Sequence, residues 1–466
     1  MSTLDTVVRL AYLAAATCFV LGLHLMNAPA TARRGNRLSI AGMLLAVAAT
    51  FVLLVDSGAT TPAGWMVLAA GAGVGTVAGL WAARVVPMTA MPQLVSLFNA
   101  VGGGAAALVA VPELVPAADA ASVRVPAALD IVIGTVTFAG SLVAAGKLQG
   151  VVPGRPVVFP GARVVGGGLA LATAIAGGLL IRGYGGGAAV AVLAVAALAL
   201  GVALVLPIGG ADMPVVISLL NACTGTAVAM AGFVTDNSVL VVAGALVGAS
   251  GAILTALMAT AMNRSLPAIL LGGYGTGDGA SGPGGTGGAP VRAVSADDAA
   301  IQLAYARRVV VVPGYGLAAA QAQHALHELA TVLASHGAEV TYAIHPVAGR
   351  MPGHMNVLLA EANVPYSEMR ELDAANAELS LADVALVVGA NDVTNPAARR
   401  PGNAISGMPI LDVDRAAAVI VIKRSMGHGY AGIDNALYTD PKTGMLFADA
   451  RAGLAALSAA VKTLVG

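Results

Sequence analysis

The sequence predicts a polytopic all-α membrane bundle of about nine helices, followed by an α/β domain with a Rossmann-like, doubly wound parallel sheet. Three observations support this fold class. The 466 residues are 58% hydrophobic and only 10% charged, a composition typical of membrane proteins. Charges become common only after Val291, where short β-branched runs alternate with helical segments. A Gly-rich segment separates the two parts.

The membrane helices are predicted from apolar runs of about 20 residues, the length that crosses the hydrocarbon core. Gly102–Gly104 and the stretch from Pro112 to Pro126 blur the ends of the fourth and fifth runs. The approximate bounds are 4–25, 38–55, 64–83, 90–112, 126–146, 166–182, 186–208, 213–234 and 238–262. Basic residues follow the first, third, fifth and ninth runs. Because such residues favour the cytoplasmic side, we expect the N-terminus outside and the C-terminal domain in the cytoplasm.

Three parts are expected along the chain: a transmembrane domain over residues 1–265, a Gly-rich flexible linker over 266–290, and a nucleotide-binding domain over 291–466. The linker contains too few apolar side chains to order itself. In the last part we expect strands at 309–312, 340–344, 384–388, 410–412 and 419–422. Helices are expected from the turn after the first strand to about Ser335, and around 357–361. This alternation is typical of a parallel sheet.

Several classes of function are disfavoured. The net charge is zero and no Lys/Arg-rich block occurs, so nucleic acid is not an expected partner. Cys18 and Cys223 lie in apolar runs, as buried thiols do, so we expect neither a disulfide nor a metal pair. His324 and His327 share a helix face, which we interpret as solvated rather than metal-binding. No Walker lysine or nucleophile elbow is present.

The sharpest motif is Val-Val-Val-Val-Pro-Gly-Tyr-Gly-Leu-Ala-Ala-Ala, residues 309–320. It places Gly314, Tyr315, Gly316 and Ala319 in a G-x-G-x-x-A turn between a strand and a helix. Glycines there allow a tight turn and a close approach of the backbone to a pyrophosphate. We therefore predict a dinucleotide site.

The residues after two strands favour NADP over NAD. The second strand ends in Ile344-His345-Pro346, without the carboxylate that usually holds the ribose of NAD. Lys423, Arg424 and Ser425 instead follow the strand at 419–422. Two cations and a hydroxyl suit a 2′-phosphate, although a solvated basic turn is the alternative. If they bind the phosphate, the nucleotide lies reversed across the sheet.

Further polar residues are candidates in both parts. In the soluble part they follow strands or lie in Gly-rich turns: Arg350 as a pyrophosphate clamp, Gly389, Asn391 and Asp392 at a strand end, and Gly429 and Tyr430 in a hinged lid. In the membrane part polar residues are few and therefore suspected of function, although bonding between helices is the simpler account. These are Asn99, Ser141, Asp212, Asn221 and Thr224.

In combination, the motifs resemble the beta subunit of the proton-translocating NAD(P) transhydrogenases, over nearly the whole chain. They are residues 91–99, 210–216, 251–265, 313–318, 345–356, 389–392 and 423–432. The resemblance implies that the membrane part translocates protons and that the soluble part binds NADP(H) in a reversed pose. It places Gly314–Gly316 and Arg350 at the pyrophosphate, residues 423–425 at the 2′-phosphate, and Asn391 and Asp392 near the nicotinamide. It makes Tyr430 part of the lid.

The resemblance also implies the partners. Separate alpha subunits bind NAD(H), and hydride passes directly between the nucleotides in a Re/Si-specific reaction that needs no catalytic side chain. The complex is expected to be a dimer of the alpha–beta unit in a bacterial cytoplasmic (inner) membrane. Some family members carry His where this chain has Asn99, whereas others with Asn place a membrane His on the partner, so the proton carrier stays unassigned.

Two alternatives stay open at this point. A transporter could use the nucleotide domain only to sense NADPH, and would then need no second nicotinamide site. A dehydrogenase merely anchored to the membrane would need a substrate pocket and an acid–base pair, and the motifs show neither.

Overall fold

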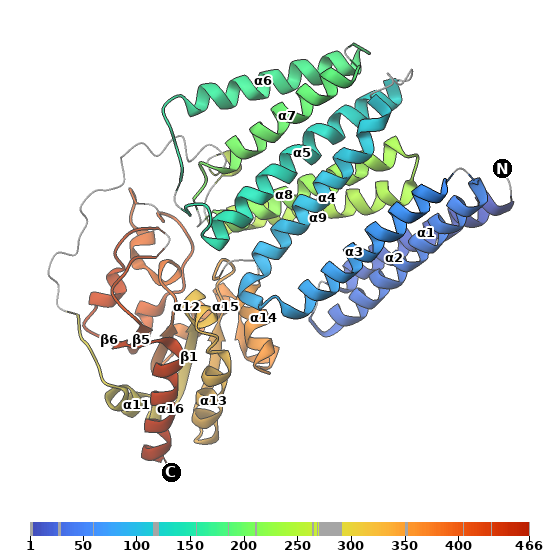
Figure 1. Cartoon of the computed structure of the whole chain (residues 1–466). Coiled ribbons are helices and arrows are strands. Elements are labelled where there is room, and N and C mark those ends of the chain that lie inside the picture. Colours follow the sequence, from blue (N-terminus) through green and yellow to red (C-terminus); the bar gives the residue numbers. More distant parts are fainter. Residues whose placement is uncertain are drawn as a thin grey trace. The chain divides into compact units, whose positions relative to one another are not determined.

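The structure, a computed structural model, describes residues 3–26, 29–58, 60–114, 121–154, 156–184, 186–209, 212–262, 265–267, 269, 291–349, 353–403, 405–429 and 431–465 (Figure 1). The chain divides into two compact units. One comprises Met1–Pro207 and Val216–Thr255, and the other comprises Ile208–Val215 and Ala256–Gly466. Most of the predicted Gly-rich linker lies outside the described residues.

Long apolar helices make up the first part of the chain (Figure 1). Within the described ranges, nine of them are long and apolar enough to cross a membrane. They are α1 (Thr3–Leu25), α2 (Pro29–Ser57), α3 (Pro62–Val85), α4 (Met91–Leu114), α5 (Ala121–Gln149), α6 (Ala162–Ile181), α7 (Gly186–Val205), α8 (Met213–Val234) and α9 (Ser238–Ala261). The predicted membrane spans are therefore confirmed. The main differences lie at helix ends, where α4 continues through Pro112 and α5 begins before Pro126.

Small residues let the central helices α4 and α5 approach closely. A Cβ added to Gly103 would lie 2.9 Å from the carbonyl oxygen of Gly134, and one on Gly134 would lie 3.0 Å from the side chain of Ala107. Lipid tails are as apolar as the helices, so association depends on such close packing rather than on a hydrophobic driving force. The α4–α5 contact is consequently made backbone to backbone.

A six-stranded parallel sheet organises the second part of the chain. Its strands are β1 (Arg308–Pro313), β2 (Glu339–Ala343), β3 (Met369–Arg370), β4 (Val384–Val388), β5 (Ala418–Lys423) and β6 (Thr443–Phe447). Their order is β3-β2-β1-β4-β5-β6, which is the strand order of the doubly wound Rossmann fold. The predicted fold class is thus confirmed.

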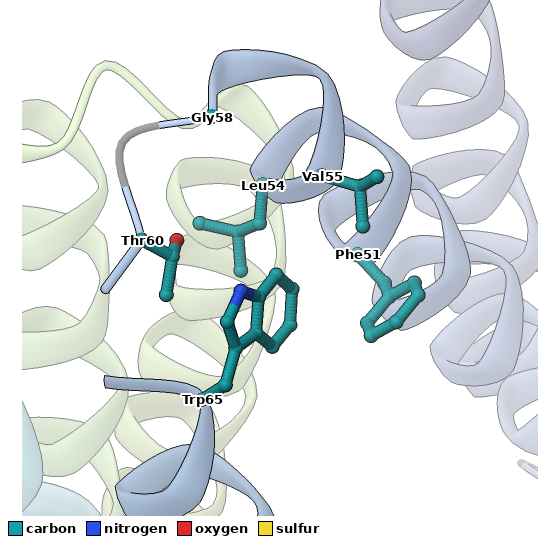
Figure 2. Close-up of a pocket in the computed structure, with 6 residues that line it drawn as sticks. All are labelled: Phe51, Leu54, Val55, Gly58, Thr60 and Trp65. Atoms are coloured by element: carbon teal, nitrogen blue, oxygen red, sulfur yellow. The ribbon is translucent and has the colours of Figure 1, made fainter. Parts of the chain in front are cut away.

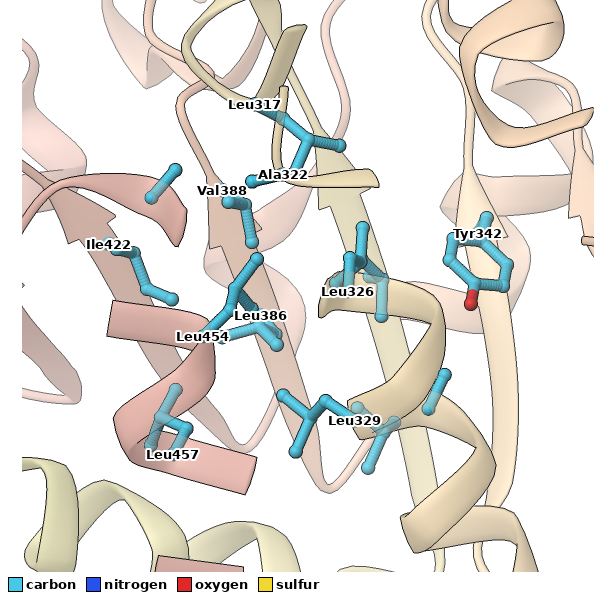
Figure 3. Close-up of a cluster of buried hydrophobic side chains, with 14 of the residues drawn as sticks. Leu317, Ala322, Leu326, Leu329, Tyr342, Leu386, Val388, Ile422, Leu454 and Leu457 are labelled. Carbon is cyan, nitrogen blue, oxygen red and sulfur yellow. The ribbon is translucent and has the colours of Figure 1, made fainter. Parts of the chain in front are cut away.

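Both faces of the sheet are buried. One face packs against α11 (Ala296–Ala304), α13 (Gln323–Ser335), α14 (His354–Glu361) and α16 (Ala450–Val465). Figure 3 shows the centre of this core, where leucines of α13 and α16 lie over Leu386, Val388 and Ile422 of the central strands. The opposite face packs against α15 (Leu372–Leu379) and short 3-10 segments. Continuous apolar strands are required because neither face meets water.

Three local predictions were wrong or incomplete. Residues 410–412 are not a strand, because the Asn376 side chain bonds the Ile410 carbonyl and the Asp412 amide in place of a strand partner. The strands β3 and β6 were not predicted, since one has two residues and the other carries Gly444. The helix after β1 is divided into α12 (Tyr315–Ala319) and α13, because Gln321 adopts a positive φ of 48°.

Candidate functional site

The carboxyl ends of β1 and β4 form the centre of the site. These strands are neighbours at the position where the strand order reverses, and open α/β sheets bind ligands in the crevice at this point. The Gly314 amide donates to the Val388 carbonyl at 2.9 Å, and the Gly316 amide donates to the Gly389 carbonyl at 2.9 Å. The turns that follow the two strands are therefore bonded to each other.

Glycine is required where the two turns meet. Gly389 has a φ of +68°, and a Cβ there would lie 2.6 Å from the Leu317 amide nitrogen. A Cβ on Gly316 would lie 2.6 Å from the Gly389 Cα. Both positions therefore require glycine, because a side chain at either one would push the two turns apart.

The predicted phosphate turn is present, but its helix is short. Gly314 is the N-cap of α12, which spans only Tyr315 to Ala319. The helix ends where the Ala320 amide donates to the Gly316 carbonyl at 3.1 Å. Because the Gly314 and Gly316 amides already bond the β4 turn, an anion here would meet the end of a single helical turn rather than the dipole of a long helix.

Asn391, the second residue after the Gly389 turn, is held by two residues that the sequence analysis missed. The Tyr438 hydroxyl donates to Asn391 Oδ1 at 3.0 Å, and Asn435 Nδ2 donates to the same oxygen at 3.1 Å. Asn391 Nδ2 is buried and has no hydrogen-bond partner among the described residues. The amide is thus oriented with its NH₂ group available. Neither Asn435 nor Tyr438 lies in a recognisable motif, so only the structure reveals them.

Lys423 ends β5 and is partly buried. Its Nζ donates to the Gly427 carbonyl at 2.5 Å and lies 4.6 Å from the centroid of the Tyr438 ring. Burial lowers the pKa of Lys423, and the negative charge of Asp392 partly opposes this effect. Arg424 and Ser425 are exposed. The basic segment therefore begins at the carboxyl end of β5 and continues into solvent.

The lid segment approaches the end of β4. The Ala431 amide donates to Asp392 Oδ2 at 3.0 Å, and a Cβ on Gly429 would collide with the Asp392 carboxylate. A hollow lies here, lined by Asn391, Met426, Gly427, His428, Ile433, Asp434, Asn435, Tyr438 and Thr439. The structure thus brings together the predicted segments after β4 and β5. Arg350 and Tyr430 lie outside the described residues.

The end of β2 carries a neutral histidine. His345 is buried, and burial lowers its pKa to about 4. The Val347 amide donates to Nδ1 at 3.2 Å, so the proton resides on Nε2, which donates to the Pro409 carbonyl at 2.7 Å. His345 therefore serves the packing of its loop and presents no charge to a ribose.

The predicted polar residues of the membrane helices lie partly together. Asn99 Nδ2 donates to the Ile217 carbonyl at 3.3 Å, and the Thr224 hydroxyl lies 3.2 Å from the Asn99 carbonyl. The Ser96 hydroxyl donates to the Ser141 carbonyl at 2.8 Å. We call Ser96, Asn99, Ser141 and Thr224 the polar seam, because they join α4, α5 and α8 through buried polar contacts.

The remaining predicted membrane residues are not part of this seam. Asn221 is only partly buried, and its side chain makes no hydrogen bond within the part of the chain that the structure describes. Asp212 is also partly buried and immediately precedes α8. One acid was missed altogether: Asp130 in α5 is fully buried. It could have been found as the only acidic residue in its span.

Two other features carry no chemistry. A hollow beside the α2–α3 turn is lined by Phe51, Leu54, Val55, Gly58, Thr60 and Trp65, with the two aromatic rings edge to face (Figure 2). It contains no titratable group. Among the described residues, no three His, Cys, Asp or Glu side chains are grouped as metal ligands.

Comparison with known proteins decides the family. The family described as NAD(P) transhydrogenase beta subunit matches residues 8–460. The NAD(P) transhydrogenase subunit beta of Rhodospirillum rubrum is 48% identical over 454 residues, which cover 95% of this chain and 96% of the relative. A second relative of the same name, from a named strain of that organism, matches equally. This chain belongs to the NAD(P) transhydrogenase beta subunit family.

Membership of this family agrees with a location of the apolar helices in a membrane. The apolar helices described above make this transhydrogenase beta subunit a multi-pass membrane protein, and its family name implies an alpha-subunit partner. The family name also implies the use of a nicotinamide nucleotide.

Proposed function

We propose that the chain binds NADP(H) and exchanges hydride with NAD(H) held by an alpha subunit, coupled to proton movement across the membrane. The observation that carries the nucleotide assignment is the charge pattern at the strand ends. Lys423 ends β5 and Arg424 follows it, next to the strand β4 and its glycine turn, while the end of β2 presents the neutral His345. Cations without a competing carboxylate suit a 2′-phosphate.

The residues present fit such a nucleotide. The turns at Gly316 and Gly389 pack backbone against backbone at the carboxyl ends of β1 and β4, and Asn391 offers a buried NH₂ without a partner among the described residues. In the proposed pose the 2′-phosphate meets Lys423, Arg424 and Ser425, and the pyrophosphate meets Gly314–Gly316. When bound, the nicotinamide supplies or accepts the hydride. The protein then binds and orients, because hydride transfer requires alignment rather than an acid–base group.

The assembly follows from the same proposal. NAD(H) lies on the alpha subunit, transfer is Re/Si-specific, and two alpha–beta units form a dimer. The complex lies in the bacterial cytoplasmic (inner) membrane, with the nucleotide domain in the cytoplasm, as the distribution of basic residues in the loops supports. Arg350 completes the pyrophosphate contacts, while Gly429 and Tyr430 belong to a lid over the nucleotide.

A double substitution tests the nucleotide assignment. Lys423→Ala with Arg424→Ala should weaken NADPH by about 3–6 kcal/mol and leave NADH little changed, because only NADPH carries the 2′-phosphate. The matched control is Arg451→Ala with Lys462→Ala, which removes two exposed cations of α16 from the same domain. Isothermal titration with both nucleotides measures the effect, and equal losses for NADPH and NADH would disprove the assignment.

Proton coupling needs a separate test. We expect Asp212→Asn, and to a lesser degree Asn99→Ala or Asn221→Ala, to slow proton-coupled turnover, since linkage requires the membrane part and the nucleotide site to affect each other. Proteoliposomes of the assembled complex with a pH-sensitive dye measure proton movement beside hydride transfer. Normal pumping in all three variants would remove these residues from the pathway, and NADPH binding without hydride exchange would favour a sensor.

A further inference from the structure

Asp130 is a buried acid that the proposed site does not use. It lies in α5, well inside the span Ala121–Gln149, and its exposed fraction is 0%. Both carboxylate oxygens lack a hydrogen-bond partner among the described residues. A carboxyl group in this setting opposes folding, and ionisable residues inside membrane spans are usually functional. Packing therefore gives no reason for an acid here.

No counter-charge compensates this carboxyl group within α5. Arg124 begins the helix, and its guanidinium lies against Gly183 in the α6–α7 connection. Lys147 near the other end donates from Nζ to the Leu206 carbonyl at 2.5 Å. No ion pair that includes Asp130 occurs among the described residues.

The helices packed against α5 do not supply a counter-charge either. These include α4, α6 and α7, and α8, whose Leu220 side chain approaches Gly140 of α5 and whose titratable side chain is Cys223. The only charged side chain of α4 is Glu113, which is exposed, and the only one of α6 is Arg163 in its first turn, also exposed. Helices α7 and α8 carry none, and Arg182 and Tyr184 lie beyond the end of α6.

The face of α5 that carries Asp130 is the face turned to the polar seam. Asp130, Gly134, Thr137 and Ser141 follow at intervals of four, three and four residues, which places them on one side of a helix. Gly134 packs against the backbone of Gly103 in α4, and Ser141 belongs to the seam itself. Asp130 therefore lies in line with the seam, toward the N-terminal end of α5.

We propose that Asp130 is a proton-binding site of the membrane domain, in line with the polar seam. This inference rests on the proposed function. The Asn, Ser and Thr side chains of the seam cannot change charge, whereas the carboxylate of Asp130 takes up one proton to become the neutral acid and releases it again. By the predicted topology, the N-terminal end of α5 faces the outside, so Asp130 meets protons arriving from that side.

The geometry also limits how the proton moves on. Asp130 and Ser141 are separated by roughly 16 Å along the helix axis, so passage between them requires intervening water, with the Thr137 hydroxyl on the way. Because Asp130 is already covered within this single chain, the alpha subunit is not needed to bury it. The side chain acts through its own protonation.

The decisive variants are Asp130→Asn, which keeps the shape but cannot ionise, and Asp130→Glu, which keeps the acid. Glu113→Gln is the matched control, since it removes an exposed acid from the neighbouring helix α4. In proteoliposomes of the assembled complex, Asp130→Asn should reduce dye-reported proton movement and steady-state turnover at least tenfold. Single-turnover hydride transfer between bound nucleotides should stay unchanged. Asp130→Glu should retain substantial pumping, and Glu113→Gln should match the wild type.

Normal pumping in Asp130→Asn would overturn the assignment, and so would a loss of single-turnover transfer in parallel with pumping. The melting temperature distinguishes a functional role of Asp130 from a structural one. Because the carboxyl group has no partner among the described residues, Asp130→Leu should melt at an unchanged or higher temperature. A lower melting temperature would overturn the proposal.

Infrared difference spectra between two pH values give a readout independent of hydride transfer. A carboxylic C=O band that is present in the wild type and absent in Asp130→Asn would support proton binding by Asp130. If the wild type shows no such band, the proposal is overturned. If instead the band is present but the wild-type complex transfers no hydride, the proposed function fails while the proton site stands.

Discussion

The membrane helices and the sheet domain satisfy their buried polar groups in different ways. In the helices, hydroxyl and amide side chains bond backbone carbonyls, as Asn99 does with Ile217 and Ser96 with Ser141. In the sheet domain side chains also bond carbonyls, as Asn376 does with Ile410, but around Asn391 they bond one another as well, as Tyr438 and Asn435 do with Asn391. The first arrangement ties helices together, whereas the second orients a particular group.

This difference changes what identifies a functional residue. In the helices a polar group is rare, so its presence alone attracts attention, and Asp130 stands out as a fully buried acid with neither carboxylate oxygen partnered among the described residues. In the sheet domain polar groups are common, so a polar residue alone does not indicate function. Two features do: a position directly after a strand, and a buried NH₂ without a partner among the described residues, such as that of Asn391. Four predictions test whether the two regions differ in this way.

The largest expected effect is a loss of stability of the sheet domain in acid. The folded pKa of His345 is about 4, below the ordinary 6.5, so between these values the unfolded chain binds a proton that the folded chain does not. The contribution of neutral His345 to the free energy of unfolding is fully present above pH 6.5, and about 3 kcal/mol of it is lost as the pH falls to 4. Urea unfolding of the fragment 291–466 followed by circular dichroism measures this loss.

The control for this prediction is His336→Gln, which removes an exposed histidine and should keep the pH dependence. His345→Gln should flatten it between pH 4 and 6.5. An unchanged slope in His345→Gln would mean that other groups cause the acid sensitivity.

Tyr438→Phe should destabilise the same fragment by about 2 kcal/mol, because buried acceptors at the end of β4 lose their donor. The lost hydroxyl lies 3.0 Å from Asn391 Oδ1 and 3.1 Å from the Ala390 carbonyl. NADPH affinity should fall as well, because Asn391 is then less firmly oriented. Tyr366→Phe, at an exposed tyrosine, is the control. Unchanged affinity in Tyr438→Phe would exclude Asn391 from the nucleotide site.

Tyr342→Phe should change the free energy of unfolding in the opposite direction to Tyr438→Phe. The Tyr342 hydroxyl is buried on the other face of the sheet and has no hydrogen-bond partner among the described residues. Removing it should therefore stabilise the fragment by about 1 kcal/mol. The same urea titration measures both tyrosine variants, and destabilisation by Tyr342→Phe would reveal a partner for this hydroxyl.

Thr224→Val should have the smallest effect, a loss of about 0.6 kcal/mol, because single hydrogen bonds between membrane helices contribute little. Thr226→Val is matched, since that hydroxyl bonds only the Ala222 carbonyl of its own helix and should have less effect. Unfolding of the full chain in detergent measures both. A loss above that of Tyr438→Phe would contradict the contrast between the regions.

Much of the fold could be predicted because its signals are local. Apolar length locates the membrane spans, and the apolar runs of β1, β4 and β5 locate the sheet centre. The edge strand β6 could not be predicted, because Gly444 accommodates the side chain of Val294 from a distant segment. The substitution of the Asn376 side chain for a strand partner at residues 410–412 is likewise a tertiary effect.

The candidate site divides in the same way. Strand-end motifs pointed to Gly314, Asn391 and Lys423, because the carboxyl ends of parallel strands meet at one edge of the sheet. Asn435 and Tyr438 come from a 3-10 segment whose approach to Asn391 has no sequence signal.

The bond between the two glycine turns has a consequence for protein engineering. Its donors and acceptors are the backbone atoms of residues 314, 316, 388 and 389, so substitutions can disrupt it only through the backbone. Proline at position 314 or 316 would remove a donor, and a Cβ at Gly316 or Gly389 would collide with the opposite turn. A designer who wishes to change nucleotide preference can therefore vary the exposed Arg424 and Ser425 while leaving these two turns unchanged.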